Sequence, residues 1–345
     1  MIEIDGSKFE GGGQILRTSC SLSQATKQAC HLFNIRKGRI RPGLARQHIL
    51  GLRALQKLCQ GKLEGDQLGS NEVWFYPGEI LARDIEIKIE TASSITLILH
   101  GLILSCLQTS NPFTISFRGG ATDTFFSPTI DYFCYVFLKI LEKIIGKKVI
   151  ELEIKKRGFY PEGGAEVEVK ILPALLKNFN LTERGKLNKV TIISGASELL
   201  KQKRVAERQS SSAKEVLRKL NLPFEEKLKY YKSTGAGSQI NIIGEFENTI
   251  IGIDNLGKLG KSAENVGKET GENFFNEGKS SSALDKHLAD QILPFMALSP
   301  GKSKVTLPEI TPHCQANIWV IEKFLKGKFE IKDKLISWNP KNLDY

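Results

Sequence analysis

Apolar positions recur with two different periods along the first 180 residues of the chain. Runs in which apolar residues alternate or follow one another predict strands, and apolar residues three to four positions apart predict helices. Leu44, Leu52 and Leu55 form one such helical stripe. The predicted helices cover residues 12–26, 43–59, 93–108 and 129–146. Besides a short strand at 2–4, the predicted strands cover residues 30–35, 72–76, 84–90, 113–118, 148–155 and 165–171. This alternation predicts an α/β fold, and its rhythm suggests a repeated α/β unit.

The pattern changes near residues 175–188, where a polar connector precedes a second and shorter α/β series. Its predicted elements are a strand from Val190 to Ile193, a helix from Ser197 to Leu220, apolar residues around 240–243, a strand from Thr249 to Ile253 and a helix at 262–276. A helix from Leu284 to Leu298, a strand at 303–307 and a helix at 316–325 then resume the first series. We therefore predict a large domain of residues 1–183 and 277–345 that carries a small inserted α/β domain, residues 184–276, in β-α-β-β-α order.

The chain has 345 residues and a net charge of +11, so it is long enough for one large domain or two ordinary ones. A basic surplus suits phosphate-rich partners, although a surface that only aids solubility gives the same count. Six cysteines without a Cys-x-x-Cys pair fit reduced thiols rather than disulfides or a zinc site. No secretory leader is visible, and the longest apolar run, Ile95 to Leu107, is too short to span a bilayer. We expect a soluble, cytoplasmic protein.

Three consecutive glycines near the N-terminus form the first candidate site. They stand in the segment 10–17, Glu-Gly-Gly-Gly-Gln-Ile-Leu-Arg, directly before a predicted helix. Glycines let backbone N–H groups approach a ligand closely, and a helix N-terminus favours an anion. Glu10 and Arg17 flank the turn with opposite charges. A plain glycine-rich turn is the alternative.

Basic residues gather between the strand at 30–35 and the helix after it. Several guanidinium groups around one loop predict a phosphate clamp, since Arg can pair with phosphate through two hydrogen bonds. A solvated charge run is the alternative. His48 lies on the apolar stripe of the following helix and His100 inside another apolar helix, where a histidine alone is more often packed than ligating. The basic and polar residues of the loop are Arg36, Lys37, Arg39, Arg41, Arg46 and Gln47.

Two candidate nucleophiles lie near the C-terminus, just before a predicted helix start. A neutral imidazole can attack phosphorus, which makes His313 a candidate covalent catalyst. Cys314 competes with it if the same helix end favours its thiolate. A capping or surface histidine is the alternative for His313.

Two further Gly-Gly loops, at 118–123 and 157–164, stand at strand ends. Each is explicable as turn chemistry, but three such loops together suggest contacts with a ligand or nucleic acid. The chain has no G-x-x-x-x-G-K-[ST], H-E-x-x-H or G-x-S-x-G motif. The segment 257–262 comes close to the first of these, but Asn255 stands where its first glycine belongs, so it is interpreted as a basic loop before a helix.

Taken in order, these segments resemble the RNA 3′-terminal phosphate cyclase family. Each motif is weak alone, whereas six motifs in family order between residues 5 and about 325 are specific. The segments that carry the resemblance are Asp5-Gly6 with Glu10 to Arg17, Arg39 to His48, Gly119-Gly120 with Pro128 to Tyr132, Arg157 to Gly164, Leu288 to Gln291, and His313 with Asn317.

The resemblance implies ATP-dependent conversion of an RNA 3′-terminal phosphate to a 2′,3′-cyclic phosphodiester, a ligase-type nucleotidyl transfer assisted by Mg²⁺ or Mn²⁺. It implies a histidyl-AMP intermediate on His313, an adenylated RNA end, and a fold of three similar α/β units with a small inserted domain. Glu10 would hold the metal or orient His313. The implied ATP-binding residues are Glu10, Arg17, Arg39, Gln47, His48, His100, His287, Asp290 and Gln291. Arg36, Arg41, Arg46 and Arg157 are expected at RNA or other phosphate groups.

Three residues depart from the family pattern and leave the nucleotide preference open. His100 stands where some members have glutamine, His287 where an aromatic residue is expected, and Ala165 where a third glycine is expected. Two other functions compete. A non-catalytic cyclase-like protein that scaffolds ribosomal RNA processing would lack the nucleophilic histidine, and an enolpyruvyl transferase would not need His313. The oligomeric state, monomer or dimer, is left open.

Overall fold

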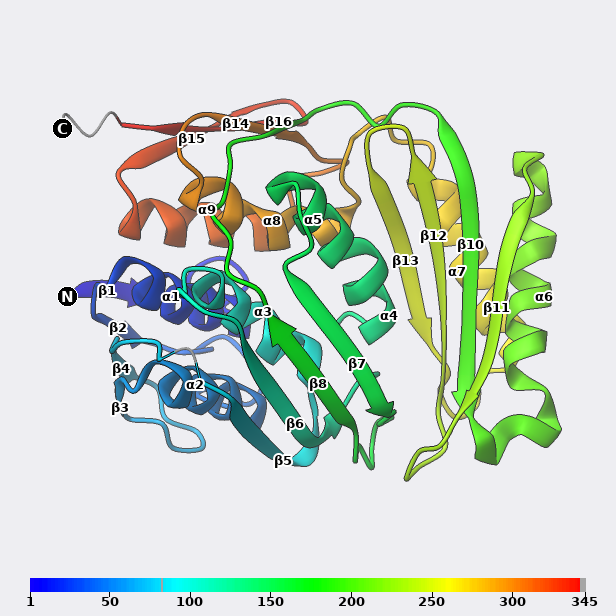
Figure 1. Ribbon diagram of the computed structural model, residues 1–345, viewed down its shortest axis with the longest axis horizontal. Helices are drawn as coiled ribbons and strands as arrows, with labels where there is room; N and C mark the ends of the chain where they lie inside the picture. The colour runs from blue at the N-terminus through cyan, green and yellow to red at the C-terminus, as the bar shows by residue number, and fades with distance from the viewer. Residues whose placement is uncertain (82, 342–345) are drawn as a thin grey trace.

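The computed structural model describes residues 1–81 and 83–341 (Figure 1). In this described part the strands form four separate four-stranded sheets, each of mixed strand direction. Three sheets surround a group of helices, and the fourth stands at one end of the long axis (Figure 1). The predicted α/β class is therefore confirmed.

The first sheet has the order β1-β2-β4-β3, in which β1 and β2 are parallel and the other neighbours antiparallel. Helix α1 connects the parallel pair, as such a connection requires. The glycine turn ends where α1 begins, because Gly11 has a left-handed φ of 56° and Gly12 is the N-cap. The elements are β1 (Ile2–Asp5), α1 (Gly13–Thr26), β2 (Cys30–Phe33), α2 (Arg46–Cys59), β3 (Lys62–Glu64) and β4 (Val73–Tyr76).

The second and third sheets repeat this order as β5-β6-β8-β7 and β9-β14-β16-β15, again with a parallel first pair followed by antiparallel neighbours. That the three units are repeats of one another stays a prediction. The second unit contains β5 (Ile85–Ser94), α3 (Ile95–Cys106), β6 (Phe113–Ala121), α4 (Ile130–Tyr132), a π-helical turn (Phe133–Phe137), α5 (Leu138–Ile145), β7 (Ile150–Lys156) and β8 (Glu166–Ile171). The third contains β9 (Asn180–Leu181), α8 (Lys286–Leu298), β14 (Ser303–Thr306), α9 (Pro312–Phe324), β15 (Gly327–Lys332) and β16 (Leu335–Pro340).

The fourth sheet has the order β11-β10-β12-β13, and its strands lie between β9 and α8 in the sequence. It has an apolar cluster of its own. It holds one strand more than the sequence predicts, because the edge strand β11 (Phe224–Tyr231) is mostly exposed and charged and has little apolar pattern. The domain division at 184 and 276 stays a prediction. The other elements are β10 (Leu187–Ser197), a 3₁₀ turn (Glu198–Lys203), α6 (Val205–Leu217), a 3₁₀ turn (Arg218–Leu220), β12 (Ser238–Phe246), β13 (Ile250–Leu256) and α7 (Ala263–Glu277).

Helices from both ends of the chain meet between the three similar sheets. Helix α1 packs against α2, α3 and α9, and α8 packs against α9, so the start of the chain lies beside its last helices (Figure 1). The six cysteines all lie in the described residues, where they are unpaired and five are buried, as expected for reduced thiols. None of the helices within residues 1–81 and 83–341 has the length and apolar character needed to cross a membrane.

Candidate functional site

A cleft of about 1060 Å³ opens where the glycine turn before α1, the first turns of α8 and the start of α9 come together. The loops after β2 and β6, helix α3 and the end of β13 also line it. Its lining carries both signs of charge, with Arg17, Arg36, Arg39 and Lys286 opposed by Glu10, Asp254, Asp290 and Glu309.

His313 lies in the first turn of α9 rather than before the helix, since α9 starts at Pro312 and not near residue 316 as predicted. Thr311 is the N-cap, and its Oγ1 accepts a hydrogen bond from the Cys314 N–H at 3.1 Å. Proline is well suited to the first helical position, because it has no N–H to leave unsatisfied. Thr311 and Pro312 therefore mark the start of α9, which the apolar pattern alone did not indicate. The side chain of His313 is 46% exposed.

Both ring nitrogens of His313 face residues of the glycine segment. Nε2 lies 2.9 Å from Glu10 Oε2, and Nδ1 is hydrogen-bonded to Gln14 Oε1. Gln14 in turn donates from Nε2 to Asp290 Oδ2 at 2.6 Å, which fixes the orientation of its amide. Gln14 is a site residue that the sequence analysis missed, and its only signal was its place directly after the glycines.

A second layer of hydrogen bonds holds this arrangement. Asn317, which is fully buried, donates from Nδ2 to the Asp290 carbonyl at 2.6 Å and accepts from Thr18 Oγ1 at 2.8 Å. These bonds connect α1, α8 and α9. Burial raises the pKa of Asp290, against the opposing effects of the Gln14 hydrogen bond and the charge of Arg17.

Three of the predicted arginines line the cleft. Arg39 Nη2 lies 3.7 Å from Glu10 Oε2, and its side chain is 45% exposed. Arg36 donates to the Gly43 carbonyl at 2.9 Å, and burial lowers its pKa. Burial also lowers the pKa of Arg17, while Asp290 acts in the opposite direction. The three cations give the cleft the means to bind a polyanion.

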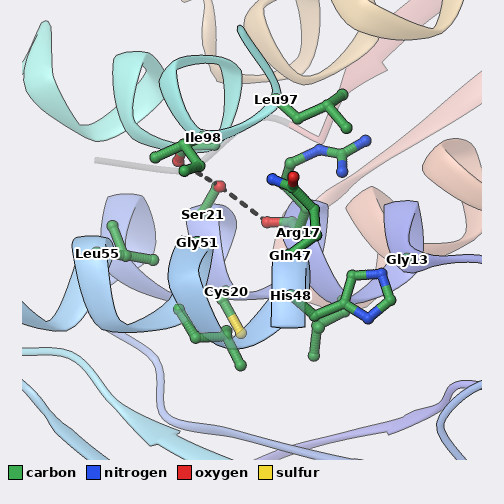
Figure 2. Close-up of a pocket in the computed structure, with 13 residues that line it drawn as sticks. Gly13, Arg17, Cys20, Ser21, Gln47, His48, Gly51, Leu55, Leu97 and Ile98 are labelled. Carbon is green, nitrogen blue, oxygen red and sulfur yellow. Dashed lines mark hydrogen bonds between the residues drawn. The ribbon is translucent and has the colours of Figure 1, made fainter. Parts of the chain in front are cut away.

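Gln47 and His48 lie behind the cleft, around a separate cavity of about 30 Å³ between α1, α2 and α3 (Figure 2). That volume has room for a water molecule but not for a nucleotide base. Gln47 donates to the Ser94 carbonyl at 3.3 Å and accepts from the Ser94 N–H at 2.6 Å. Gly13, Arg17 and Leu97 border both the cavity and the cleft, so they connect the two.

His48 is neutral near physiological pH, because burial lowers its pKa to about 4. Its Nδ1 accepts from the Ala45 N–H at 3.1 Å, which leaves the proton on Nε2. A Cβ added at Gly13 would overlap His48 Nε2, so the third glycine of the run is required for helix α1 to approach α2. The predicted ATP contacts of Gln47 and His48 stay predictions.

The cleft is also lined by His100, on α3, and by His287 and Gln291, on α8. His100 Nε2 pairs with the Gln291 carbonyl at 3.2 Å, and burial lowers its pKa to about 3, so the ring is neutral with its proton on Nε2. Gln291 donates from its side chain to the His287 carbonyl at 2.7 Å. His287 itself is exposed.

Three residues predicted at phosphates do not line the cleft. Arg41 and Arg46 are exposed on the neighbouring loop and the first turn of α2. Arg157 is only 3% exposed and forms ion pairs with Asp123 at 3.1 Å and Asp131 at 2.7 Å. Both carboxylates hold its guanidinium away from solvent, and the phosphate contact predicted for Arg157 stays a prediction.

Cys314, the competing nucleophile, is buried and faces the core. Burial raises the pKa of its thiol to about 11, so the nucleophilic thiolate is disfavoured near neutral pH. His313, which is partly exposed in the cleft, is the better placed nucleophile of the two.

A metal ion would find one well-placed carboxylate here. Within the described residues no cluster of three or more His, Cys, Asp or Glu side chains could hold a metal. Mg²⁺ is commonly bound by one or two carboxylates together with substrate phosphates, so Glu10 at the edge of the cleft fits a shared site of that kind.

Comparisons with known proteins agree with the resemblance seen in the sequence. A family profile described as RNA 3′-terminal phosphate cyclase matches residues 8–331. A relative of that name from Pyrococcus furiosus is 43% identical over 335 residues, which are 96% of this chain and 95% of the relative. Relatives of the same name from Methanopyrus kandleri and Saccharolobus solfataricus are 39% and 42% identical, each over 97% of this chain and at least 96% of the relative.

A solved structure of EPSP synthase from Acinetobacter baumannii is also similar, with a TM-score of 0.41 and 11% identity over 99% of this chain and 48% of the other. A likeness at this level says nothing about function.

Proposed function

The chain belongs to the RNA 3′-terminal phosphate cyclase family, and we propose that it is an ATP-dependent enzyme that converts an RNA 3′-phosphate to a 2′,3′-cyclic phosphodiester. The observation that carries the proposal is the setting of His313, with Nδ1 on Gln14 and Nε2 beside Glu10, in a cleft that three arginines also line. That setting suits nucleophilic attack on a phosphate ester.

The first step is the transfer of AMP to His313. Because Gln14 Oε1 accepts from Nδ1–H, a neutral imidazole in this position presents its lone pair on Nε2. Nε2 attacks the α-phosphorus of ATP, a nitrogen–phosphorus bond forms, and pyrophosphate leaves. Arg17, Arg36 and Arg39 stabilise the negative charge that grows on the phosphate oxygens.

Glu10 must change partners during this step. Its carboxylate lies 2.9 Å from Nε2, where the phosphorus has to approach, and 3.7 Å from Arg39. A shift of the carboxylate toward Arg39 would free Nε2 and take away any proton that it carries. In the same place Glu10 would hold a Mg²⁺ or Mn²⁺ ion, which supplies charge neutralisation at the phosphates of ATP.

The remaining steps use the RNA end. An oxygen of the RNA 3′-phosphate attacks the phosphorus held by His313, so AMP moves to the RNA and Nε2 is released. The neighbouring 2′-OH then attacks the activated 3′-phosphate, loses its proton and expels AMP. Only RNA carries this hydroxyl, so a DNA 3′-phosphate would stop at the adenylated end.

Incubation with ATP labelled at the α-phosphate tests the first step. We expect the protein to acquire an acid-labile label, His313→Ala to abolish it, and Cys314→Ala to retain it because the buried thiol is not the nucleophile. Labelling of the His313→Ala protein at the wild-type level would refute the proposed mechanism.

Matched RNA and DNA oligonucleotides with a 3′-phosphate test the later steps. The RNA should yield a product whose terminal phosphate resists phosphatase, and the DNA should yield at most an adenylated end. A cyclic product in the absence of ATP would contradict the proposed role of the adenylate.

A further inference from the structure

The loop between β6 and α4, residues 122–129, carries exposed aromatic side chains at the cleft. Phe125 and Phe126 both line the cleft that contains His313. Phe126 is fully exposed, at 102%, and Phe125 is 38% exposed. Phe125 packs edge-to-face against Tyr160, with ring centroids 5.6 Å apart, and so supports the base of the loop. A single exposed apolar residue is ordinary, but Phe126 has a second unusual property.

Phe126 adopts a left-handed backbone conformation, with a φ of 62°. A bulky residue in that region is a genuine outlier, because its Cβ crowds the backbone. Glycine would remove both the crowding and the exposed ring. Strained residues of this kind are retained where the surrounding structure imposes them, and they gather at ligand-binding sites.

Buried bonds hold both ends of the loop that carries Phe126. Arg157 bonds to Asp123 before the exposed rings and to Asp131 after them, at 3.1 and 2.7 Å. The guanidinium thus ties the two ends of the loop together in a buried ion-pair cluster. Tyr231 of β11 covers it, since its ring centroid lies 4.3 Å from the Arg157 Cζ.

The fourth sheet holds the same loop from a second side. The Thr129 N–H donates to Asp254 Oδ2 at 2.6 Å, and Thr129 Oγ1 donates to Asn241 Oδ1 at 2.9 Å. Within the loop, Ser127 Oγ donates to the Thr124 carbonyl at 2.9 Å. The ring of Phe126 is therefore presented to solvent on a rigid support rather than on a free loop.

We propose that Phe126 is a stacking platform for a base near the 3′ end of a single-stranded RNA, an assignment that rests on the function proposed above. An RNA whose terminal phosphate reaches His313 must bring its last nucleotides to the mouth of the same cleft. Unpaired bases have exposed faces, and aromatic side chains bind them without reading the sequence. Arg36, Arg39 and Lys286 on the cleft wall supply cations for the phosphates between those bases.

The RNA is favoured over the base of ATP as the partner of this ring. Phe126 stands fully in solvent, whereas a nucleotide base is usually enclosed by its pocket. His100, which is partly buried and neutral, also lines the cleft and packs edge-to-face against Phe137 at 5.2 Å, so it offers a more enclosed surface for such a base. If the ring instead contacted ATP, its loss would weaken the binding of ATP rather than the binding of RNA.

Binding of a short, fluorescently labelled, 3′-phosphorylated RNA, measured by anisotropy without ATP, tests the platform. We expect Phe126→Ala to weaken this binding roughly tenfold and Phe126→Trp to retain it. Leu259→Ala is the matched control, since Leu259 is equally exposed, at 103%, on a loop that does not line the cleft. Replacing the last bases of the RNA by abasic ribose should weaken binding to the wild type and change little for Phe126→Ala.

Two results would overturn the platform. One is an RNA affinity of Phe126→Ala equal to that of the wild type, with the same melting temperature. The other is a Phe126→Ala protein whose self-labelling with ATP is weakened while its RNA affinity is unchanged. That result would show that the ring contacts ATP rather than RNA. Absence of any wild-type self-labelling would instead refute the proposed cyclase mechanism, and the RNA affinities would still decide the role of Phe126.

Discussion

Two groups of charged residues, one around His313 and one around Arg157, are built in opposite ways. Around His313, the side chains of Arg39 and Glu10 are 45% and 39% exposed and lie 3.7 Å apart. Around Arg157, the guanidinium is 3% exposed and bonds two carboxylates that are themselves buried. The first group keeps its charges open to a ligand, and the second has paired its charges within the protein.

This difference in exposure and pairing separates residues that act on a ligand from residues that hold the structure in place. A buried cation that two carboxylates hold cannot meet a phosphate without breaking those pairs, which is costly in a low-dielectric interior. A half-exposed and loosely paired cation can change partners at little cost. We therefore expect substitutions in the Arg157 cluster to act on stability and those around His313 to act on catalysis or ligand affinity.

Loss of Arg157 should give the largest effect. Arg157→Met leaves Asp123 and Asp131 buried without their cation, and burial already raises the pKa of Asp123. We expect the free energy of unfolding to fall by about 3–5 kcal/mol, measured by urea denaturation. Arg39→Met, the matched exposed arginine, should change it by less than about 0.5 kcal/mol. Equal losses for the two variants would contradict the comparison.

Loss of Gln14 should affect the rate of self-labelling. Gln14→Leu removes the acceptor for His313 Nδ1–H, so the ring is no longer held with its lone pair on Nε2. We expect a rate about 100-fold lower, or ~2.7 kcal/mol, with little change in the ATP concentration for half-maximal rate. Asp290→Asn keeps an acceptor for the Gln14 amide, so its rate of self-labelling should fall much less than that of Gln14→Leu. A Gln14→Leu protein with an unchanged rate would remove Gln14 from the mechanism.

The partly buried His100 should make the stability of the protein depend on pH. It stays neutral in the folded protein, with a pKa of about 3, whereas an unfolded histidine takes up a proton below about pH 6.5. Its contribution to stability is therefore complete above that pH and is lost as the pH falls toward the folded pKa. Between about pH 7 and pH 5, His100→Gln should lose about 2 kcal/mol less stability than the wild type. Identical pH profiles would show that His100 is not kept neutral.

Loss of Arg39 should give the smallest effect and one confined to the ligand. Because Arg39 is half exposed and only loosely paired, Arg39→Ala should leave the melting temperature unchanged. We expect ATP affinity to fall about tenfold, or ~1.4 kcal/mol, by calorimetric titration. Arg41→Ala, an exposed arginine of the same loop that does not line the cleft, is the control. Equal losses for both would point to general charge attraction.

The sequence alone could predict the α/β class and most of the helices, because local periodicity encodes them. Helix α1 was predicted at 12–26 and lies at Gly13–Thr26, and the helix predicted at 93–108 is Ile95–Cys106. Strand β11 escaped because a charged edge strand has no apolar alternation. The start of α9 was misplaced because Pro312 and His313, its first two residues, line the cleft and add nothing to the apolar pattern.

Only those residues of the candidate site that stand in a recognisable motif could be predicted from the sequence. His313 and Glu10 were both identified, but their 2.9 Å contact joins opposite ends of the chain. Gln14 was missed because nothing near it in sequence shows that it meets His313. The buried pairing of Arg157 could not be predicted, because an Arg-Gly loop looks the same in sequence when its guanidinium faces a ligand and when it faces two buried carboxylates.

The most direct measurement is mass-spectrometric mapping of the adduct that forms when the wild-type protein is incubated with ATP and Mg²⁺ or Mn²⁺. We expect a single AMP group on the peptide that contains His313, attached through a ring nitrogen, lost on mild acid treatment and transferable to RNA with a 3′-phosphate. An AMP group on Cys314, on a lysine or on another histidine would contradict the assignment of His313 as the nucleophile.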